Sequence, residues 1–398
     1  MNFLPAKHGL NCCPKKLTRF LLAWLAAFCV YSLPACAADP SSKATPDMLV
    51  FINGDKLAGH LDHEADGIVF FDSDNAGTVQ VPWAKLKSLK TSKPFAVIQN
   101  GTSVKRKNPN LNVPVGTLEL HGDTLSVATL QGVQEIPVKN VQYLVDKATF
   151  DHTVLGPQRL LEGITGSLSA GDSTVNSTQN SQSVNTGVTL ARGVPAVTWM
   201  PPRDRTLLNF SNTYGRISQP NTPTVKTNIL YGGLEEDEYF NPRFYLLEQV
   251  MYDHNFSQGL DLQQIYGAGF GYTVFKHPKQ ELDLTATLDY TKQQFTSTGA
   301  GTAAPAPGAT NNLIGSSIGN TYFYKFPRKI LFNETATITP QWNALQDYSA
   351  AVTAGATFPI FKNFGLSAQV IDSYLNDPAP GFNGNSLQFN TGLTYTIQ

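Results

Sequence analysis

Residues 281–291 read Glu-Leu-Asp-Leu-Thr-Ala-Thr-Leu-Asp-Tyr-Thr, so apolar and polar side chains alternate along the whole stretch. In an extended chain Leu284 and Leu288 point to one side, whereas Asp283 and Asp289 point to the other. This period of two predicts a β-strand with one apolar and one polar face. The stretch is about twice as long as the average strand of a soluble protein, which has about 5–6 residues.

The same alternation recurs from about residue 160 to the end of the chain. It defines twelve candidate strands, at residues 164–172, 184–192, 206–217, 225–234, 244–252, 260–275, 282–295, 314–326, 330–342, 348–358, 364–374 and 387–397. We therefore expect an all-β protein with a C-terminal antiparallel transmembrane β-barrel over residues 160–398. Its apolar faces would meet lipid and its polar faces would line the lumen. Closure removes the free edges that lipid does not tolerate.

The connections between these strands fit one orientation of the barrel. An even number of strands places both ends of the barrel on one side of the membrane. Connections on that side are expected to be short, as at 276–279, 327–328 and 359–362. Connections on the other side are expected to be longer and more polar, as at 297–312.

The composition excludes several other classes of protein. Charged residues make up 15% of the chain, hydrophobic residues make up 41%, and the formal net charge is −1. A disordered chain, or a protein that binds nucleic acid through bulk charge, would need a larger net charge. Beyond residue 38 the longest apolar run is residues 48–52, whereas a membrane-spanning helix needs about 20 residues.

The first 37 residues have the features of an export signal. Basic residues precede an apolar run at 20–31, which is too short to span a membrane as a helix, and the small residues 35–37 supply a cleavage site. A lipoprotein signal, in which Cys36 is acylated, is the alternative. Residues 38–46 would then form a linker. All four cysteines lie within residues 1–37, so we expect an exported chain without disulfides.

Between the linker and the barrel, one pattern of residues occurs twice. Residues 48–55 and 94–101 each combine a short apolar strand with an Asn-Gly turn, which is a strong hairpin signal. Residues 81–89 and 136–144 share a common ending. We therefore predict two small SH3-like β modules, at residues 47–92 and 93–150. A single mixed β domain with chance similarity is the alternative.

If the barrel is hollow, the polar faces of its strands line a passage. Candidate lumen-lining residues carry acidic, amide or hydroxyl groups: Asp261, Gln263, Glu281, Asp283, Asp289, Thr335 and Thr337. Barrels of about eight strands fill their own lumen and barrels of about sixteen leave an open pore, so twelve strands predict a narrow passage. The acidic residues predict a weak preference for cations.

Candidate chemistry is limited to the outer rim of the barrel. His254 ends a strand beside Asp253, and Asp261 follows across a short connection. A histidine beside carboxylates is a candidate general base, and the carboxylates are candidate ligands of a divalent cation. A solvated acidic rim explains the same residues more simply. We therefore expect no enzyme activity, no cofactor and no metal.

Several motifs in the barrel region together resemble one family. The opening strand at 166–173 is followed by Tyr-Gly-Arg at 214–216, Arg-Phe-Tyr at 243–245, a motif at 252–263 beginning Tyr-Asp-His-Asn-Phe, and Gly-Ala-Gly-Phe-Gly-Tyr at 267–272. Through them, residues 163–398 resemble the salt-induced outer membrane protein family, the domain of unknown function 481. Asp172, Gln263 and the ending Thr396-Ile397-Gln398 depart from the family pattern, which usually has Asn, Arg and a final aromatic residue there.

The resemblance implies an outer-membrane barrel of the Gram-negative envelope without an established activity. It also implies that the β modules lie in the periplasm and that the C-terminal strand is recognised by the barrel-assembly machinery. Three functions remain open. The first is a narrow passive channel or structural barrel, the second is a lipid-modifying enzyme that uses His254, and the third is an anchor whose periplasmic modules bind peptidoglycan or a protein. For binding, Trp83 and Trp199 are the aromatic candidates.

Overall fold

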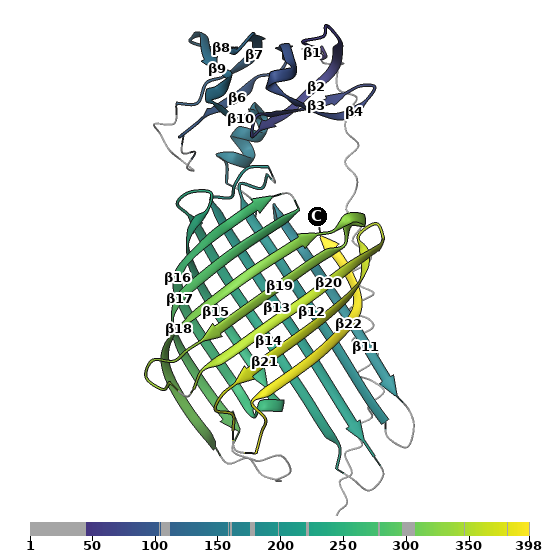
Figure 1. Cartoon of the computed structure of the whole chain (residues 1–398), viewed down its shortest axis with the longest axis vertical. Helices are drawn as coiled ribbons and strands as arrows, with labels where there is room; N and C mark the ends of the chain where they lie inside the picture. Colours follow the sequence, from purple (N-terminus) through teal and green to yellow (C-terminus); the bar gives the residue numbers. More distant parts are fainter. Residues whose placement is uncertain are drawn as a thin grey trace, which may run out of the picture. The chain divides into compact units, whose positions relative to one another are not determined.

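A computed structural model describes residues 45–397 except 103, 105–111, 158, 160, 176–179, 198, 220–222, 278, 297–306, 346 and 380. The expected export signal and most of the expected linker therefore lie outside the described residues. The described chain forms two sheets, an N-terminal ten-stranded sheet and a closed twelve-stranded barrel. Figure 1 shows both, with the strands labelled.

The barrel follows the chain in sequence order. Its strands are β11 (Ile164–Val175), β12 (Asn180–Val194), β13 (Asp204–Ser218), β14 (Val225–Tyr239), β15 (Phe244–Asn255), β16 (Leu260–His277), β17 (Gln280–Thr296), β18 (Pro307–Lys325), β19 (Leu331–Thr339), β20 (Ser349–Phe361), β21 (Phe364–Leu375) and β22 (Asn385–Ile397). Each strand pairs antiparallel with its neighbours, and β11 pairs with β22 to close the barrel. All twelve strands match those predicted from the alternation of side chains.

The two faces of the wall differ as the alternation predicts. On β17, Leu284 and Leu288 are 47% and 64% exposed on the outer face, whereas Asp283 and Asp289 are 4% and 3% exposed. Apolar side chains therefore cover the outside of the wall, and polar side chains turn inward. We call the end where β11 begins and β22 ends the proximal end, and the opposite end the distal end.

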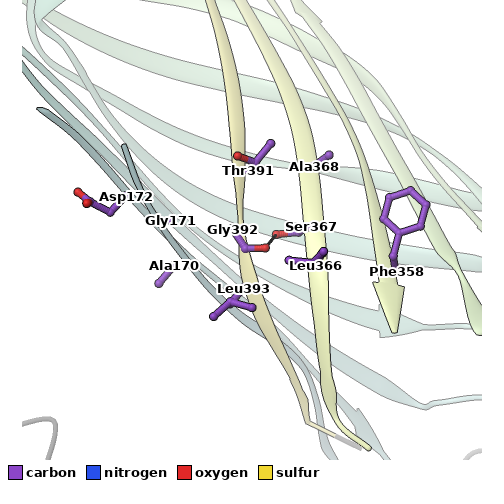
Figure 2. Close-up of a pocket in the computed structure, with 10 residues that line it drawn as sticks. All are labelled: Ala170, Gly171, Asp172, Phe358, Leu366, Ser367, Ala368, Thr391, Gly392 and Leu393. Atoms are coloured by element: carbon purple, nitrogen blue, oxygen red, sulfur yellow. Dashed lines mark hydrogen bonds between the residues drawn. The ribbon is translucent and has the colours of Figure 1, made fainter. Parts of the chain in front are cut away.

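The closing seam between β11 and β22 is the shortest pairing in the barrel. The two strands pair at five positions, from Gly166↔Ile397 to Ala170↔Leu393. Beyond Ala170, the described residues of β11 pair only with β12, and the rest of β22 pairs only with β21. Figure 2 shows a pocket beside the end of this pairing, lined by residues of β11, β20, β21 and β22. The ladder between β11 and β22 therefore covers residues 166–170 and 393–397.

The N-terminal sheet is built from two sets of five strands that follow one another in the sequence. Its first five strands are β1 (Asp47–Phe51), β2 (Lys56–Ala65), β3 (Ile68–Ser73), β4 (Gly77–Pro82) and β5 (Leu86–Lys90), and the second five are β6 (Phe95–Gln99), β7 (Val115–His121), β8 (Thr124–Thr129), β9 (Gly132–Pro137) and β10 (Val141–Asp146). In each set a 3-10 turn precedes the last strand, η1 (Trp83–Lys85) and η2 (Val138–Asn140).

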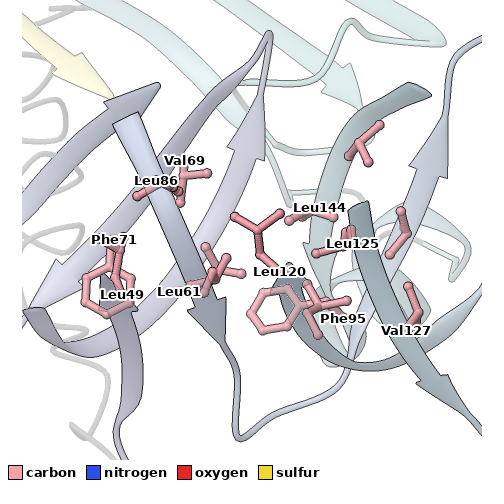
Figure 3. Packing of buried hydrophobic residues seen from close by; sticks show 14 of the residues in the cluster. Leu49, Leu61, Val69, Phe71, Leu86, Phe95, Leu120, Leu125, Val127 and Leu144 are labelled. Carbon is pink, nitrogen blue, oxygen red and sulfur yellow. The ribbon is translucent and has the colours of Figure 1, made fainter. Parts of the chain in front are cut away.

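The two repeats share one sheet, and both contribute residues to its buried clusters. β10 pairs with β2 at Tyr143↔Ala65, and β5 meets β7 at Lys90↔Glu119. Buried residues of both repeats form a large cluster, part of which is drawn in Figure 3, and a second, smaller one around Ile98 and Tyr143. A repeat of this size has too little apolar surface for a core of its own, which explains why the two units join.

The chain between the sheet and the barrel is helical. α2 (Lys147–Thr149) runs into a wider turn, η3 (Phe150–Val154), and Asp146 caps the start by accepting hydrogen bonds from two backbone amides. Among the described residues, no helix has the length and hydrophobicity needed to cross a membrane.

Candidate functional site

The inner wall of the barrel is crowded along β14–β18. Residues that are almost fully buried there are Asp237, Tyr245, Leu247, Gln263, Ile265, Thr273, Asp283, Thr287, Asp289, Thr291, Gln293, Leu313 and Ser317. Glycines of β16 make room for them. A Cβ atom at Gly267 would lie 2.1 Å from Asp289 Oδ1, and one at Gly271 would lie 2.0 Å from the Tyr245 ring. Side chains thus fill this side of the lumen and pack onto the glycines of β16.

Near the proximal end, one arginine joins strands that are not neighbours. Arg205 of β13 donates from Nε to Asp237 Oδ2 of β14 at 2.6 Å. Its Nη1 reaches Asp283 Oδ2 of β17 at 2.9 Å and lies 3.5 Å from Glu281 Oε1. We call these four residues the Arg205 cluster. Because β15 and β16 lie between β14 and β17 in the wall, the arginine spans part of the lumen rather than following its surface.

Two tyrosine rings hold the guanidinium of Arg205. Its Cζ lies 5.6 Å from the Tyr239 ring centroid and 5.2 Å from that of Tyr245, and the two rings are 4.8 Å apart. Within the described chain, Asp237 Oδ1, Asp283 Oδ1 and both tyrosine hydroxyls are buried without a hydrogen-bond partner. Buried polar atoms of this kind are normally satisfied by water or ions. The cluster therefore offers oxygen atoms to the inside of the barrel.

A second polar network crosses the middle of the crowded side. Gln249 Nε2 of β15 donates to Thr287 Oγ1 at 3.2 Å and to Asp289 Oδ1 at 3.4 Å. The Ser317 hydroxyl of β18 donates to Asp289 Oδ2 and lies 3.0 Å from Thr339 Oγ1. Asp289 is therefore held by side chains from two other strands. This fixes the shape of the crowded half.

At the distal end, a connection crosses the mouth of the barrel. The turn η4 (Phe256–Gln258) between β15 and β16 contacts β21 and β22, which lie on the opposite side of the closed sheet. Gln258 Nε2 donates to Ser373 O at 2.9 Å and to Gly384 O at 2.7 Å, and Ser257 Oγ donates to Ser386 Oγ at 3.1 Å. We call this contact between residues 255–260 and 373–386 the distal bridge.

Apolar packing supports the distal bridge. Leu260, Phe295, Leu375, Ala379 and Phe382 form one cluster. Gly259 adopts φ +67°, and a Cβ there would lie 2.7 Å from Ala379 Cβ. A side chain at 259 is therefore excluded by both the backbone conformation and the neighbouring alanine. The bridge is a packed structure and restricts the distal mouth.

The other half of the inner wall is open to water. On β11, β12 and β19–β21, many inward-facing residues are small or polar and are partly or fully exposed: Ser167, Ser169, Asn185, Gly187, Thr189, Thr335, Thr337, Thr353, Gly355, Ser367 and Gln369. Small side chains leave space where the long ones of β14–β18 would fill it. The lumen is therefore filled on one side and accessible to solvent on the other.

The structure places the residues predicted to line the lumen in different parts of the barrel. Glu281 and Asp283 belong to the Arg205 cluster, and Asp289 belongs to the central network. Gln263 is buried on the inner wall, where it accepts a hydrogen bond from Gln293 at 2.8 Å, and Thr335 and Thr337 lie on the inner face of the open half. Asp261 instead lies at the distal rim with 68% of its side chain exposed, because a bulge after Leu260 shifts the alternation.

The expected rim site is not assembled as a catalytic pair. Asp253 and His254 are successive residues of β15, so their side chains leave opposite faces of the strand. His254 Nδ1 bonds the Asp261 carbonyl and lies 3.9 Å from its carboxylate. In the described part of the chain, no three His, Cys, Asp or Glu side chains are placed to hold a metal ion.

Both tryptophan candidates for binding are half-buried. Trp83 packs against the core of the N-terminal sheet. Trp199, in the connection between β12 and β13, stacks on His63 with ring centroids 4.4 Å apart. Neither ring is therefore fully available to a partner.

Sequence reasoning missed two parts of the site. Arg205 and Asp237 lie on the inward face of their strands, as the alternation of side chains predicts for Asp283. Extending the predicted strands to their proximal ends would therefore have placed both residues in the lumen. The distal bridge had no such signal, because Gln258 and Gly384 come together only when the barrel closes.

A closed antiparallel barrel with an apolar outer wall and a polar inner wall defines the class of transmembrane β-barrel proteins. The family model described as "Protein of unknown function, DUF481" matches residues 170–397, which is more than half of the chain. The chain therefore belongs to this family, in agreement with the resemblance of its motifs. No curated protein matches the chain.

Solved structures with a related fold include three that differ in their described roles. The translocator domain of the autotransporter NalP from Neisseria meningitidis is 14% identical, over 58% of this chain and 87% of that one, with a TM-score of 0.33. The NanC porin is 5% identical over 58% and 100%, with a TM-score of 0.35. The COG4313 outer membrane channel from Pseudomonas putida F1 is 13% identical over 60% and 97%, with a TM-score of 0.34.

Proposed function

We propose that this protein is a narrow, cation-preferring channel of the outer membrane and not an enzyme. The observation that carries the proposal is the two-sided lumen. One half is filled by the Arg205 cluster and the Asp289 network, and the other half is lined by small, solvent-accessible polar residues. A barrel that served only as an anchor would have no need for an open half.

The charges of the lumen support a preference for cations. Carboxylates on the inner face are Glu235, Asp237, Asp253, Glu281, Asp283 and Asp289. Among the described residues, Arg205 and Lys276 are basic side chains that pair with them, so carboxylates remain in excess. In a narrow passage with low-dielectric walls, such an excess of one charge raises the local concentration of the opposite ion.

The proposal also gives the barrel an orientation. Apart from residues 195–203, the connections at the proximal end are short, as between β16 and β17 or β20 and β21, whereas those at the distal end include residues 340–348 and 376–384. Barrels of the outer membrane have short periplasmic turns and longer outer loops. We therefore infer that the proximal end and the N-terminal sheet face the periplasm. Binding of the sheet to the cell wall or to a protein is a separate proposal.

Single-channel recording of the refolded full chain in a planar bilayer tests the proposal. We expect small, discrete conductance steps and, in a potassium chloride gradient, a reversal potential displaced toward that of potassium. The double variant Asp283→Asn/Asp289→Asn should reduce this displacement, because it removes two lumenal charges. The matched control is Glu334→Gln, whose carboxylate accepts a hydrogen bond from Asn320 on the outer face of β19.

Two results would overturn the proposal. A folded barrel that shows no conductance at any voltage would leave no passage to assign. A reversal potential that Asp283→Asn/Asp289→Asn and Glu334→Gln change equally would show that the lumenal carboxylates do not set ion preference.

A further inference from the structure

The N-terminal sheet contains a junction between its two repeats that the proposed channel does not use. There, β5 and β7 join through the single pair Lys90↔Glu119. The other junction, between β10 and β2, has three pairs and ends at Val145↔His63. The two junctions are equivalent, because β5 and β10 each follow a 3-10 turn, and β2 and β7 each lead into a tight hairpin. In this alignment Lys90 corresponds to Val145. The junction of β5 and β7 is therefore a partly opened copy of the other one.

A groove of about 650 Å³ lies where β5 and β7 separate. Leu86 of β5 and Leu120 of β7, which are labelled in Figure 3, form its floor and belong to the core of the sheet. Val50 of β1 and Ile52 after it extend this apolar surface outward, and Ile52 is 66% exposed. The groove is therefore apolar at its base and open to solvent.

The equivalent junction shows what covers such a face. There, Ile98 and Tyr143 pack with Trp199 and Met200, which come from the connection between β12 and β13. The Trp199 ring also stacks on His63, with ring centroids 4.4 Å apart. A segment of polypeptide with an aromatic side chain therefore fills this face of the repeat.

The groove has the same framework with a more polar surface. Val50 pairs with Ser88 in β1 and β5 as Ile98 pairs with Tyr143 in β6 and β10. Both Val50 and Ser88 line the groove. A serine in the place of a tyrosine leaves space and offers a hydroxyl. The open face therefore favours a partner that binds reversibly, because interfaces of transient complexes are more polar than permanent ones.

The groove is bordered by more basic than acidic side chains. Lys87 lines it, Lys85 belongs to the turn η1 that forms one wall, and Lys56 lies next to β1 in the ladder with β2. All three lysines are exposed. The acidic side chains are Asp123, which lines the groove, and Asp55, which precedes β2. This excess of positive charge favours a partner with acidic residues.

We propose that this groove is a docking site for an extended segment of a partner protein, in which a large aromatic side chain is flanked by acidic residues. The aromatic ring would fill the groove against Leu86 and Leu120, as Trp199 fills the equivalent junction. The acidic residues would meet Lys85 and Lys87. The site belongs to the N-terminal sheet alone, so it does not depend on whether the barrel conducts ions.

Fluorescence anisotropy with the full chain in nanodiscs tests the docking site. The probe is a labelled peptide, Asp-Glu-Ala-Val-Thr-Trp-Met-Asp-Glu, which places the sequence of residues 196–200 between acidic residues. We expect saturable binding in the micromolar range that weakens as the salt concentration rises. Replacing the tryptophan of the probe by alanine should weaken binding by about tenfold or more, since buried aromatic anchors carry most of the energy of an interface. A probe with lysines in place of its acidic residues should bind more weakly than the original.

Two variants of the protein locate the binding to the groove. Ser88→Tyr introduces the tyrosine that the other repeat has at this position, so the fold accommodates it, and the ring should block the groove and weaken binding at least tenfold. Its control is Gln80→Tyr on the exposed face of β4, outside the groove. Lys87→Glu should weaken binding of the acidic probe and remove part of its salt dependence. Its control is Lys139→Glu, an exposed lysine in the turn η2 of the other repeat.

Three results would overturn the docking site. The first is a probe that does not bind, or that binds Ser88→Tyr and Gln80→Tyr equally well. The second is self-association of the chain, seen by analytical ultracentrifugation, that Ser88→Tyr abolishes, since the groove would then hold a second copy. The third is competition by peptidoglycan sacculi for the probe in the wild type, which would assign the groove to a glycan. A conductance measurement affects none of these results.

Discussion

The ring of Tyr245 occupies the space that a side chain at position 271 would need, because a Cβ on Gly271 would lie 2.0 Å from Tyr245 Cζ. The ring lies on the bare backbone of β16 and carries the guanidinium of Arg205, 5.2 Å from its centroid. One glycine thus lets the arginine reach from β13 to Asp283 on β17. The narrowing of the proximal lumen depends on this contact.

Gly271→Ala should therefore destabilise the barrel, by about 1–3 kcal/mol, because an added methyl group forces the Tyr245 ring to move. Urea unfolding followed by heat modifiability on gels measures the effect. The control is Gly232→Ala on β14, where a new Cβ has no atom within 4 Å and the change should be small. The double variant Gly271→Ala/Tyr245→Leu should recover part of the loss. Equal stability of the two single variants would contradict this account.

Arg205→Met should have a larger effect than either glycine variant. It leaves Asp237 and Asp283, which are 0% and 4% exposed, without their cation. Breaking a buried ion pair by removing one partner costs about 3–5 kcal/mol. The triple variant Arg205→Met/Asp237→Asn/Asp283→Asn should regain most of that stability in urea. If the single and triple variants unfold at the same urea concentration, the charges of the cluster are not coupled.

Gln258→Ala should loosen the distal bridge and increase conductance. The substitution removes the hydrogen bonds to Ser373 O and Gly384 O, which together contribute about 2 kcal/mol at about 1 kcal/mol each. Longer open times with an unchanged reversal potential are expected, since Gln258 carries no charge. Gln264→Ala, on the outer face of β16, serves as the control. A conductance equal to that of the control would mean that the bridge does not restrict the passage.

The period of two in the sequence is sufficient to predict the strands of the barrel wall but not the side-chain contacts inside the lumen. Leu284 and Asp283 alternate because each strand faces lipid on one side and the lumen on the other, a constraint that acts on every residue locally. All twelve strands could be found in this way. The inward position of Asp289 follows from the same rule.

Contacts across the lumen lie beyond such reasoning. Arg205 meets Asp283 only because the sheet closes with a particular stagger, and Gln258 reaches Gly384 only across the finished mouth. Neither contact produces a periodic pattern in the sequence. The bulge after Leu260 could not be predicted from periodicity either. Its extra residue moves the Asp261 carboxylate from the inner wall to the rim.

Protonation of Glu64 should control the stability of the N-terminal sheet. Glu64 on β2 is 0% exposed, and burial raises its pKa to about 7. The hydrogen bond that its carboxylate accepts from the Gly67 amide lowers the pKa, but by less than burial raises it. An unfolded chain ionises this carboxyl near pH 4.5, whereas the folded sheet retains the proton until about pH 7. The stabilisation is therefore complete below pH 4.5 and is lost as the pH rises to about 7, a change of about 3 kcal/mol.

Hydrogen exchange of the β2 and β10 amides in the full chain, corrected for the intrinsic effect of pH on exchange, measures this loss. Protection should fall between pH 5 and pH 7.5 in the wild type. Glu64→Gln cannot ionise, so it should keep the same protection at both pH values. The matched control is Glu135→Gln on β9, whose side chain is exposed and should leave the wild-type pH dependence in place. A pH dependence that survives in Glu64→Gln would assign the effect to another group of the sheet.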